Sequence, residues 1–172
     1  YQVGNRDTGG WDPTDPKKHV EWSANTNQSL NGKMNPAAKL LKWARREKPT
    51  KSAKPKGLPL EIFVADGLPV SENNYGKMMN LIFADFVERY ENHRFWGSCP
   101  HIEDPAVAGN NLLNGVSGDE FAAYYDKVKT HLQDSTIALE TDDDEEATSR
   151  WRKIFGDRFP SGSTKQTSSL LG

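Results

Sequence analysis

The chain has 172 residues, with 22 lysines and arginines against 24 aspartates and glutamates and a formal net charge of −2. This length suffices for one domain with its own core, and the charge balance excludes a protein that binds nucleic acid over its whole surface. The mean hydropathy is −0.79 and no apolar run approaches the ~18 residues of a membrane span, so we expect a soluble, cytoplasmic protein without membrane contact. The single cysteine, Cys99, excludes an internal disulfide framework and fits a reducing compartment.

The first thirty residues predict a connection followed by a helix. Residues 1–6 have the length of a short edge strand, and the Gly-Gly and Asp-Pro pairs up to Pro16 are typical of a connecting segment. Thr14 is the expected cap of a helix over residues 17–28, which Asn31 and Gly32 end.

Residues 35–47 predict an amphipathic helix with a basic side. Asn35 is a good N-cap, and Pro36 falls at the first helical position, where its missing N–H costs nothing. At 100° per residue the apolar face comprises Ala37, Leu40, Leu41 and Ala44, and the opposite arc carries Lys39, Lys42 and Arg46. Such a row of cations suits a polyphosphate, because charge-assisted hydrogen bonds are stronger than neutral ones. The alternative is a solvated basic face.

The middle of the chain predicts a loop and a helix. Residues 50–57 are Lys, Pro, Ser and Ala with flanking Thr and Gly, and we expect an exposed, mobile loop. The apolar run 58–65 is too short to assign from its period. Residues 74–93 predict a helix whose core face comprises Tyr75, Met78, Met79, Ile82, Phe86 and Tyr90.

The last third predicts a loop, two helices and a tail. Residues 95–116 are rich in Gly, Asn and Pro, as loops are. A capping box from Ser117 to Glu120 opens a helix with an expected core face of Phe121, Tyr124, Tyr125, Val128 and Leu132. The acidic run 140–146 is the expected solvated start of a final helix, which buries Ala147, Trp151, Ile154 and Phe155 and stops at Gly156. From Ser161 the composition is that of a flexible segment.

Metal sites and catalytic triads find little support. His93, Cys99 and His101 lack a fourth zinc ligand and a paired Cys-x-x-Cys. The acidic residues 142–146 lack the glycine and alternation of a calcium loop. The four histidines have no motif context for a nucleophilic triad.

Four stretches, taken in order, resemble the bacterial cGAS/DncV-like nucleotidyltransferases (CD-NTases), relatives of the oligoadenylate synthases. They are Gly-Gly-Trp-Asp-Pro-Thr-Asp-Pro (9–16), Asn-Pro-x-x-Lys-Leu-Leu-Lys-Trp with a later Leu-Glu (35–61), Ile-Glu-Asp-Pro with Asn-Asn-Leu (102–112), and Trp-Arg-Lys-Ile-Phe-Gly-Asp-Arg-Phe-Pro (151–160). The resemblance implies a mainly α fold, the helical bundle that forms the C-terminal lobe of a polymerase-β-like nucleotidyltransferase. It implies that residues 1–13 end the catalytic lobe and connect it, that 14–160 form the helical lobe with 58–65 as a buried helix, and that 161–172 are a flexible tail.

The catalytic carboxylates of this family follow a Gly-Ser signature as Asp-x-Asp, and we find no such stretch here. Gly97-Ser98 leads instead to Cys99-Pro100. We therefore expect a fragment without catalytic residues, whose catalytic lobe, with its Mg²⁺, lies N-terminal to Tyr1. The complete protein would join nucleoside triphosphates into a cyclic di- or trinucleotide second messenger in bacterial antiphage defence, by two-metal phosphoryl transfer.

The resemblance also implies nucleotide-binding residues. Lys42 matches the family lysine that reaches the triphosphate, and Lys39 lies one turn before it. The family often has Ser and an aromatic residue before x-Leu-Glu, where this chain has Gly57 and Leu58, so a hydroxyl and a stacking ring are missing. Lys56 is the expected replacement for the phosphate contact, and recognition of the base stays unassigned.

The C-terminal residues suggest a second role. In some CD-NTases a ubiquitin-activating-like enzyme conjugates the C-terminal residue to targets, and by resemblance Gly172 is the attachment point, with Leu170 and Leu171 as apolar handles. A tail that ends in glycine without such a role is the alternative. For the lobe, the alternative is a nucleic-acid-sensing or other binding module of the oligoadenylate synthase-like family, supported only by Lys48, Lys51, Lys54 and Lys56. These lysines lack interleaved aromatic residues, so specific nucleic-acid binding is not expected.

Overall fold

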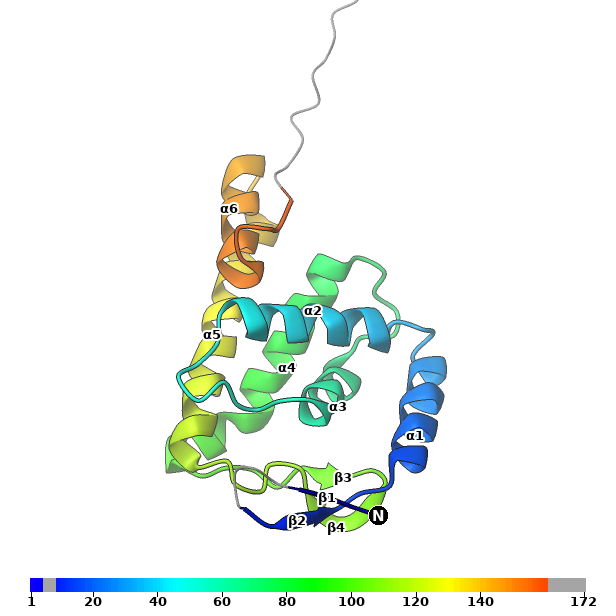
Figure 1. Cartoon of the computed structure of the whole chain (residues 1–172). Helices are drawn as coiled ribbons and strands as arrows, with labels where there is room; N and C mark the ends of the chain where they lie inside the picture. The colour runs from blue at the N-terminus through cyan, green and yellow to red at the C-terminus, as the bar shows by residue number, and fades with distance from the viewer. Residues whose placement is uncertain (5–8, 161–172) are drawn as a thin grey trace, which may run out of the picture.

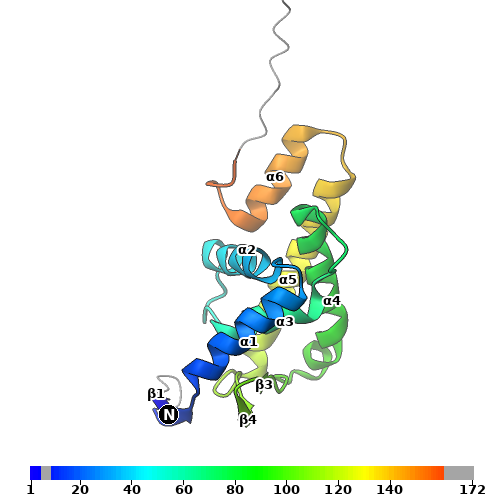
Figure 2. The same ribbon diagram turned by 90° about the vertical axis from the view of Figure 1, so that its right-hand side faces the viewer.

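The structure, a computed structural model, describes residues 1–4 and 9–160 and is mainly helical, as expected. The elements are, in chain order, β1 (Gln2–Gly4), β2 (Trp11–Pro13), α1 (Pro16–Ser29), α2 (Met34–Glu47), α3 (Leu58–Gly67), α4 (Tyr75–Trp96), β3 (Glu103–Asp104), β4 (Val107–Asn111), α5 (Gly118–Glu140) and α6 (Asp144–Phe155). The long helices α4 and α5 lie side by side, α2 and α3 cover one side of this pair, and α6 folds back at one end (Figures 1 and 2). The expected helical bundle is thus confirmed, including α3 as a buried helix.

Two short antiparallel hairpins lie at the opposite end of the bundle from α6, beside the start of α1 (Figure 1). β1 pairs with β2, with Val3 opposite Asp12, so the expected edge strand finds its partner within this chain. β3 pairs with β4 inside the segment that we expected to be only loop. That prediction was wrong because β3 has only two residues, both acidic, and β4 contains a Gly and two Asn, so neither strand has an alternating apolar pattern.

The core joins α2, α3, α4 and α5 through aliphatic and aromatic side chains. The Phe63 ring meets the ring of Phe86 edge-on at a centroid distance of 5.0 Å and that of Tyr90 at 5.5 Å. The expected core faces are largely confirmed: Met78, Met79, Ile82, Phe86 and Tyr90 on α4, Phe121, Tyr124, Tyr125 and Val128 on α5, and Ile154 and Phe155 on α6 are all buried. Four predicted core residues of these three helices depart from this pattern: Leu132, Ala147 and Trp151 are only partly buried, and Tyr75, at the first position of α4, is 43% exposed.

The helix ends correct two predicted caps. The N-cap of α1 is Asp15 and not Thr14, and the carboxylate of Asp15 accepts a hydrogen bond from the backbone N–H of Lys18 at 3.2 Å. α2 begins one residue before Asn35, with Lys33 as its N-cap, and the N–H of Asn35 donates to Asn27 Oδ1. The capping box of Ser117 and Glu120 is confirmed.

The basic loop between α2 and α3 is anchored at two points, which contradicts its expected exposure in part. The ammonium of Lys54 donates to the carbonyl of Gly115 at 2.9 Å and pairs with the Glu120 carboxylate at 3.4 Å. The Arg45 guanidinium donates to the carbonyl of Ala53, and Pro55 is buried. Loop and helix ends therefore hold one another in place.

Among the described helices, none combines the length and the apolar character that a membrane crossing needs.

A buried histidine makes this fold sensitive to acid. His131 on α5 is 4% exposed, and its Nδ1 has no hydrogen-bond partner among the described residues. Burial, helped by the nearby charge of Lys127 and opposed by that of Asp134, lowers the pKa of His131 to about 4. The neutral imidazole is therefore the form that the fold accommodates.

Replacing His131 tests this acid sensitivity. The pKa of His131 is lower in the folded than in the unfolded chain, so below about pH 6.5 the unfolded chain takes up a proton that the folded chain does not. The free energy of unfolding therefore has its full value above about pH 6.5 and decreases as the pH falls toward 4. Between pH 7 and pH 5 the loss amounts to about 2 kcal/mol. We expect urea unfolding of His131→Leu to lack this part of the pH dependence. Equal loss of stability in both proteins would contradict the assignment.

A close backbone approach between α4 and α5 gives a second stability prediction. Gly97 ends α4 with φ +63°, and a Cβ added at Gly118, in the first turn of α5, would lie 1.9 Å from the Gly97 carbonyl oxygen. We expect Gly118→Ala to lower the free energy of unfolding by about 1–3 kcal/mol. Gly4→Ala, for which no atom of the described residues beyond its chain neighbours lies within 4 Å of the added methyl, is the control and should change the free energy of unfolding by less than about 0.5 kcal/mol. Similar stabilities for the two variants would show that the helices separate without cost.

Candidate functional site

A hollow of about 600 Å³ lies between α2 and α3, and we call it the basic hollow. It is lined by Lys39, Lys42, Trp43, Arg45, Arg46, Gly57 and Leu60. The amphipathic character predicted for α2 is confirmed, since Ala37, Leu41 and Ala44 are buried on the opposite side. The helix thus sets four cationic side chains along one concave surface.

The cations of the basic hollow differ in their partners. Lys42 forms an ion pair with Glu61, which lies in the first turn of α3. Arg46 pairs with the neighbouring Glu47 at 3.5 Å. Lys39 is exposed and has no carboxylate partner in the described part of the chain. An anion that binds at Lys42 must therefore compete with Glu61.

The N-terminus of α3 borders the basic hollow and adds to its positive potential. Gly57 is the N-cap, no described side chain caps this helix end by a hydrogen bond, and Glu61 is the acidic side chain in its first turn. The N–H groups at the helix end carry a partial positive charge. Gly57 has φ +69° and ψ −127°, a conformation that favours glycine. The glycine that stands in place of the family serine therefore matches the backbone of this chain.

Lys56 lies in a second hollow, around the other side of Gly57. This polar cavity, of about 610 Å³, is bounded by α1, the β3–β4 hairpin and the start of α3, and its polar lining includes His19, Ser23, Lys56, Glu61, Asp104, Asn110 and Asn111. The structure thus brings Lys39 and Lys42 together but separates Lys56 from them. The two hollows meet at the Lys42–Glu61 pair, since Glu61 lines the polar cavity.

A buried carboxylate organises the polar cavity. The side chain of Asp104 accepts hydrogen bonds from the backbone N–H of Ala106 at 2.8 Å, from the Asn110 amide at 2.9 Å and from the imidazole of His19 at 2.7 Å. Burial favours the neutral acid, but these hydrogen bonds outweigh it and hold the pKa of Asp104 below its usual value. Asp104 is therefore an ionised anchor between α1 and the hairpin.

Sequence reasoning did not select His19, Asp104 or Asn110 as site residues. Asp104 and Asn110 do lie in the Ile-Glu-Asp-Pro and Asn-Asn-Leu stretches that carry the family resemblance. Nothing in the sequence indicates that His19, 85 residues before Asp104, completes the group.

The other sequence candidates have separate surroundings. His93 Nδ1 shares a hydrogen bond with Ser98, and His101 pairs with Glu103 at 2.7 Å. Burial raises the pKa of Cys99 to about 11. In residues 1–4 and 9–160 no group of three or more His, Cys, Asp and Glu is placed to hold a metal ion. The acidic run caps and begins α6, and the conjugation candidates Leu170, Leu171 and Gly172 lie outside the described residues.

Comparison with known proteins gives a consistent result at the level of sequence. No protein-family model matches the chain. It is 36% identical to a cyclic AMP-AMP-AMP synthase of Acinetobacter sp. over 92% of its own length and 46% of the relative's. It is 28% identical to a probable cyclic AMP-AMP-GMP nucleotide synthase of Salmonella paratyphi B over 91% of its own length and 41% of the relative's. The chain spans less than half the length of these curated relatives.

Solved structures share the fold. E. coli MS115-1 CdnC, solved with ATP, superimposes with a TM-score of 0.76 at 18% identity, over 92% of this chain and 55% of CdnC. The same protein in a complex with HORMA-deltaN gives 0.73 at 19% identity, over 92% and 57%. The expected resemblance is thereby confirmed: the chain is similar to the C-terminal, helical part of cyclic oligonucleotide synthases of the CD-NTase type.

Proposed function

We propose that this chain binds the triphosphate of a nucleotide as the helical part of a cyclic oligonucleotide synthase. The observation that carries the proposal is the basic hollow, in which three predicted cations of α2 line a concave surface at the uncapped N-terminus of α3. Fixed cations and a helix N-terminus both favour phosphate oxygens. The names of the curated relatives, which are cyclic trinucleotide synthases, support this reading.

In this role each cation makes a different contribution. The phosphate would draw the Lys42 ammonium away from Glu61, so that an existing ion pair is exchanged for a new one. Lys39 has no ion pair with a described residue to give up, and so adds its full charge. Arg46, which is also exposed, holds Glu47 only at 3.5 Å and can offer two parallel N–H groups.

Catalysis requires parts that the described residues do not supply. We propose that a preceding catalytic lobe holds Mg²⁺, which when bound activates a hydroxyl and stabilises the leaving pyrophosphate. Four apolar side chains at the N-terminal end of this chain are 52–93% exposed: Tyr1, Val3, Trp11 and Val20. Such exposed apolar side chains suit packing against a preceding lobe. The helical part then orients the nucleotide, which lowers the entropic cost of the reaction.

We further propose that the complete protein serves antiphage defence and that a ubiquitin-activating-like enzyme conjugates Gly172 to targets. The chemistry needs a slender C-terminal carboxylate, and glycine has no side chain to obstruct its approach. Leu170 and Leu171 would enter an apolar groove of that enzyme. The last described helix, α6, lies at the opposite end of the bundle from the hairpins and the start of α1 (Figure 1).

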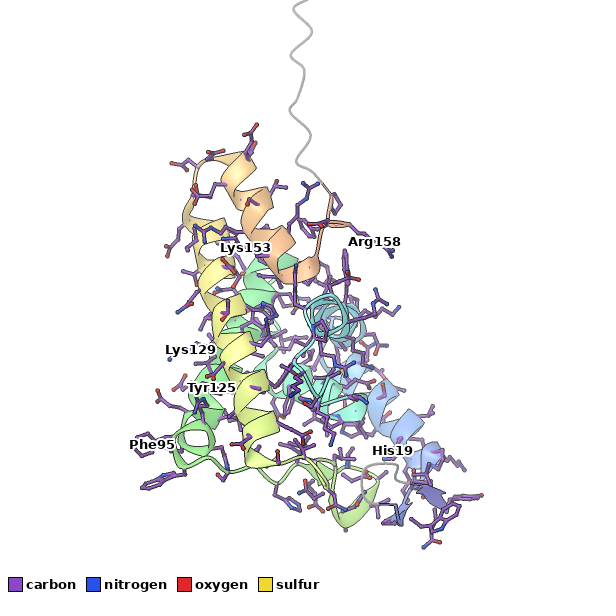
Figure 3. The ribbon with its side chains drawn as sticks, turned by 60° about the vertical axis from the view of Figure 1, so that its left-hand side comes forward. His19, Phe95, Tyr125, Lys129, Lys153 and Arg158 are labelled. Atoms are coloured by element: carbon purple, nitrogen blue, oxygen red, sulfur yellow. The ribbon has the colours of Figure 1, made fainter. Side chains whose placement is uncertain are left out.

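Lys42→Ala tests the triphosphate site in the complete protein. Loss of a charge-assisted hydrogen bond costs about 1.5–3 kcal/mol, and the lower value applies here because Lys42 must first leave Glu61. We therefore expect about tenfold weaker ATP binding by calorimetry, and a melting temperature lowered by no more than about 4 °C through loss of the ion pair. Lys129→Ala removes an exposed charge from α5, away from α2 (Figure 3), and should bind ATP as the wild type does. Equal affinities of the Lys42 variant and the wild type would refute the site.

Glu61→Gln should act in the opposite direction. The amide keeps the size of the side chain but removes the carboxylate that competes for Lys42. A partly exposed ion pair contributes up to about 1 kcal/mol, so we expect ATP affinity to rise by about two- to fivefold. Weaker binding would mean that Glu61 instead positions Lys42 for the phosphate.

Deletion of Gly172 tests the conjugation proposal. Mixing the complete protein with its cognate activating enzyme and ATP should give a species that hydroxylamine cleaves, as expected for a thioester. We expect this species to disappear when Gly172 is deleted. Deletion of Gly162 shortens the same tail by one residue but keeps its end, and should leave the thioester intact. A thioester that survives loss of Gly172 would contradict the assignment.

A further inference from the structure

The polar cavity has a feature that triphosphate binding does not use. Asp104 is 3% exposed and lines this cavity. Its carboxylate accepts hydrogen bonds from both His19 on α1 and Asn110 on β4. A buried carboxylate is costly unless its hydrogen bonds are satisfied, and here it fixes the orientation of two side chains that both line the cavity.

The hydrogen bonds to Asp104 determine which atoms of Asn110 and His19 remain available to a ligand. The ionised carboxylate only accepts hydrogen bonds, so Asn110 must turn its NH₂ group toward Asp104 and its carbonyl oxygen Oδ1 away. His19 likewise carries its hydrogen on Nε2, which leaves Nδ1 as an acceptor in the neutral ring. Neither Asn110 Oδ1 nor His19 Nδ1 has a partner in the described part of the chain. The cavity thus offers one fixed acceptor, Asn110 Oδ1, and a second, His19 Nδ1, when the imidazole is in its neutral form.

The rest of the lining combines apolar side chains with a cation, which suits a ligand that carries an aromatic ring and an anionic group. Apolar side chains of Val20, Leu58 and Leu112 contribute walls, while Lys56 is an exposed cation on the rim. The cavity also meets the basic hollow at the Lys42–Glu61 pair. A molecule that crosses this boundary would place a phosphate among the cations and an aromatic ring beside the two acceptors.

We propose that the polar cavity reads the base of the nucleotide, with Asn110 Oδ1 and His19 Nδ1 accepting hydrogen bonds from an exocyclic amino group. This inference rests on the proposed function, because the triphosphate of the same nucleotide lies in the basic hollow. Adenine, guanine and cytosine carry such an amino group and uracil does not. Asp104 is a positioning residue, and Asn110 and His19 are specificity residues. The site replaces recognition by a stacked ring, which Leu58 cannot provide.

The test compares ATP with purine riboside 5′-triphosphate, which differs from ATP by the absence of the amino group. Affinities are measured by calorimetry on the complete protein that contains this chain. We expect the wild type to prefer ATP by about tenfold, as one or two neutral hydrogen bonds would give. Asn110→Ala should reduce the preference to about twofold or less. Asn92→Ala, an exposed amide on α4, is the matched control and should keep the full preference.

The outcomes separate this inference from the proposed function. Lys42→Ala should weaken both nucleotides equally and leave their ratio unchanged. If Lys42→Ala weakens binding but Asn110→Ala keeps the tenfold preference, base reading is overturned and the triphosphate site stands. If Asn110→Ala melts early, His19→Ala takes its place, and an unchanged preference there overturns the inference equally. A wild type that does not distinguish the two nucleotides, or binds neither, also overturns it.

Discussion

The packing of aromatic rings around Phe86 is the interaction on which the rest of this structure depends. Phe86 lies 4.9 Å from Tyr90 on its own helix, 5.0 Å from Phe63 on α3, and 5.5 Å from Tyr124 on α5, measured between ring centroids. Edge-on and tilted contacts of this kind stabilise beyond the apolar area that they bury. The cluster therefore fixes α3 and α5 against α4, and with α3 it fixes the helix end that separates the two hollows.

The positive charge of the candidate site is concentrated on one surface of this helical bundle. The chain has a net charge of −2, yet one surface of α2 gathers Lys39, Lys42, Arg45 and Arg46. Arg45 is partly committed to the basic loop through the Ala53 carbonyl, so it holds the site together. Glu61 serves both hollows, because it compensates Lys42 in one and lines the other. A substitution of Glu61 should thus affect both the basic hollow and the polar cavity.

Most of the helices were predictable from the sequence because their signals are local, whereas α3 followed only from the family resemblance because the apolar run 58–65 is too short to show a period. Apolar spacing on α4 and the Ser117–Glu120 box depend on residues within a few turns of one another. The contacts that shape the polar cavity are different in kind: His19 meets Asp104 across 85 residues, and no periodicity encodes that pairing. Likewise Thr14 and Asp15 are both good caps, and the choice of Asp15 follows only from where the helix begins. The roles of Lys39, Lys42 and Lys56 stay predictions, although the structure separates Lys56 from the other two.

The shallow attachment of α1 bears on how the protein moves. None of its side chains is fully buried; it is held by the contact of Trp22 with the core, by His19 at Asp104, and by Asn27 at the start of α2. An element with so few contacts opens more readily than the domain unfolds, and its amide hydrogens exchange accordingly. Because α1 forms one wall of the polar cavity, any molecule that fills the cavity also ties this wall to the hairpin. Binding in the cavity should therefore reduce the local opening of α1. The mobility of this one surface helix then depends on whether the cavity is occupied.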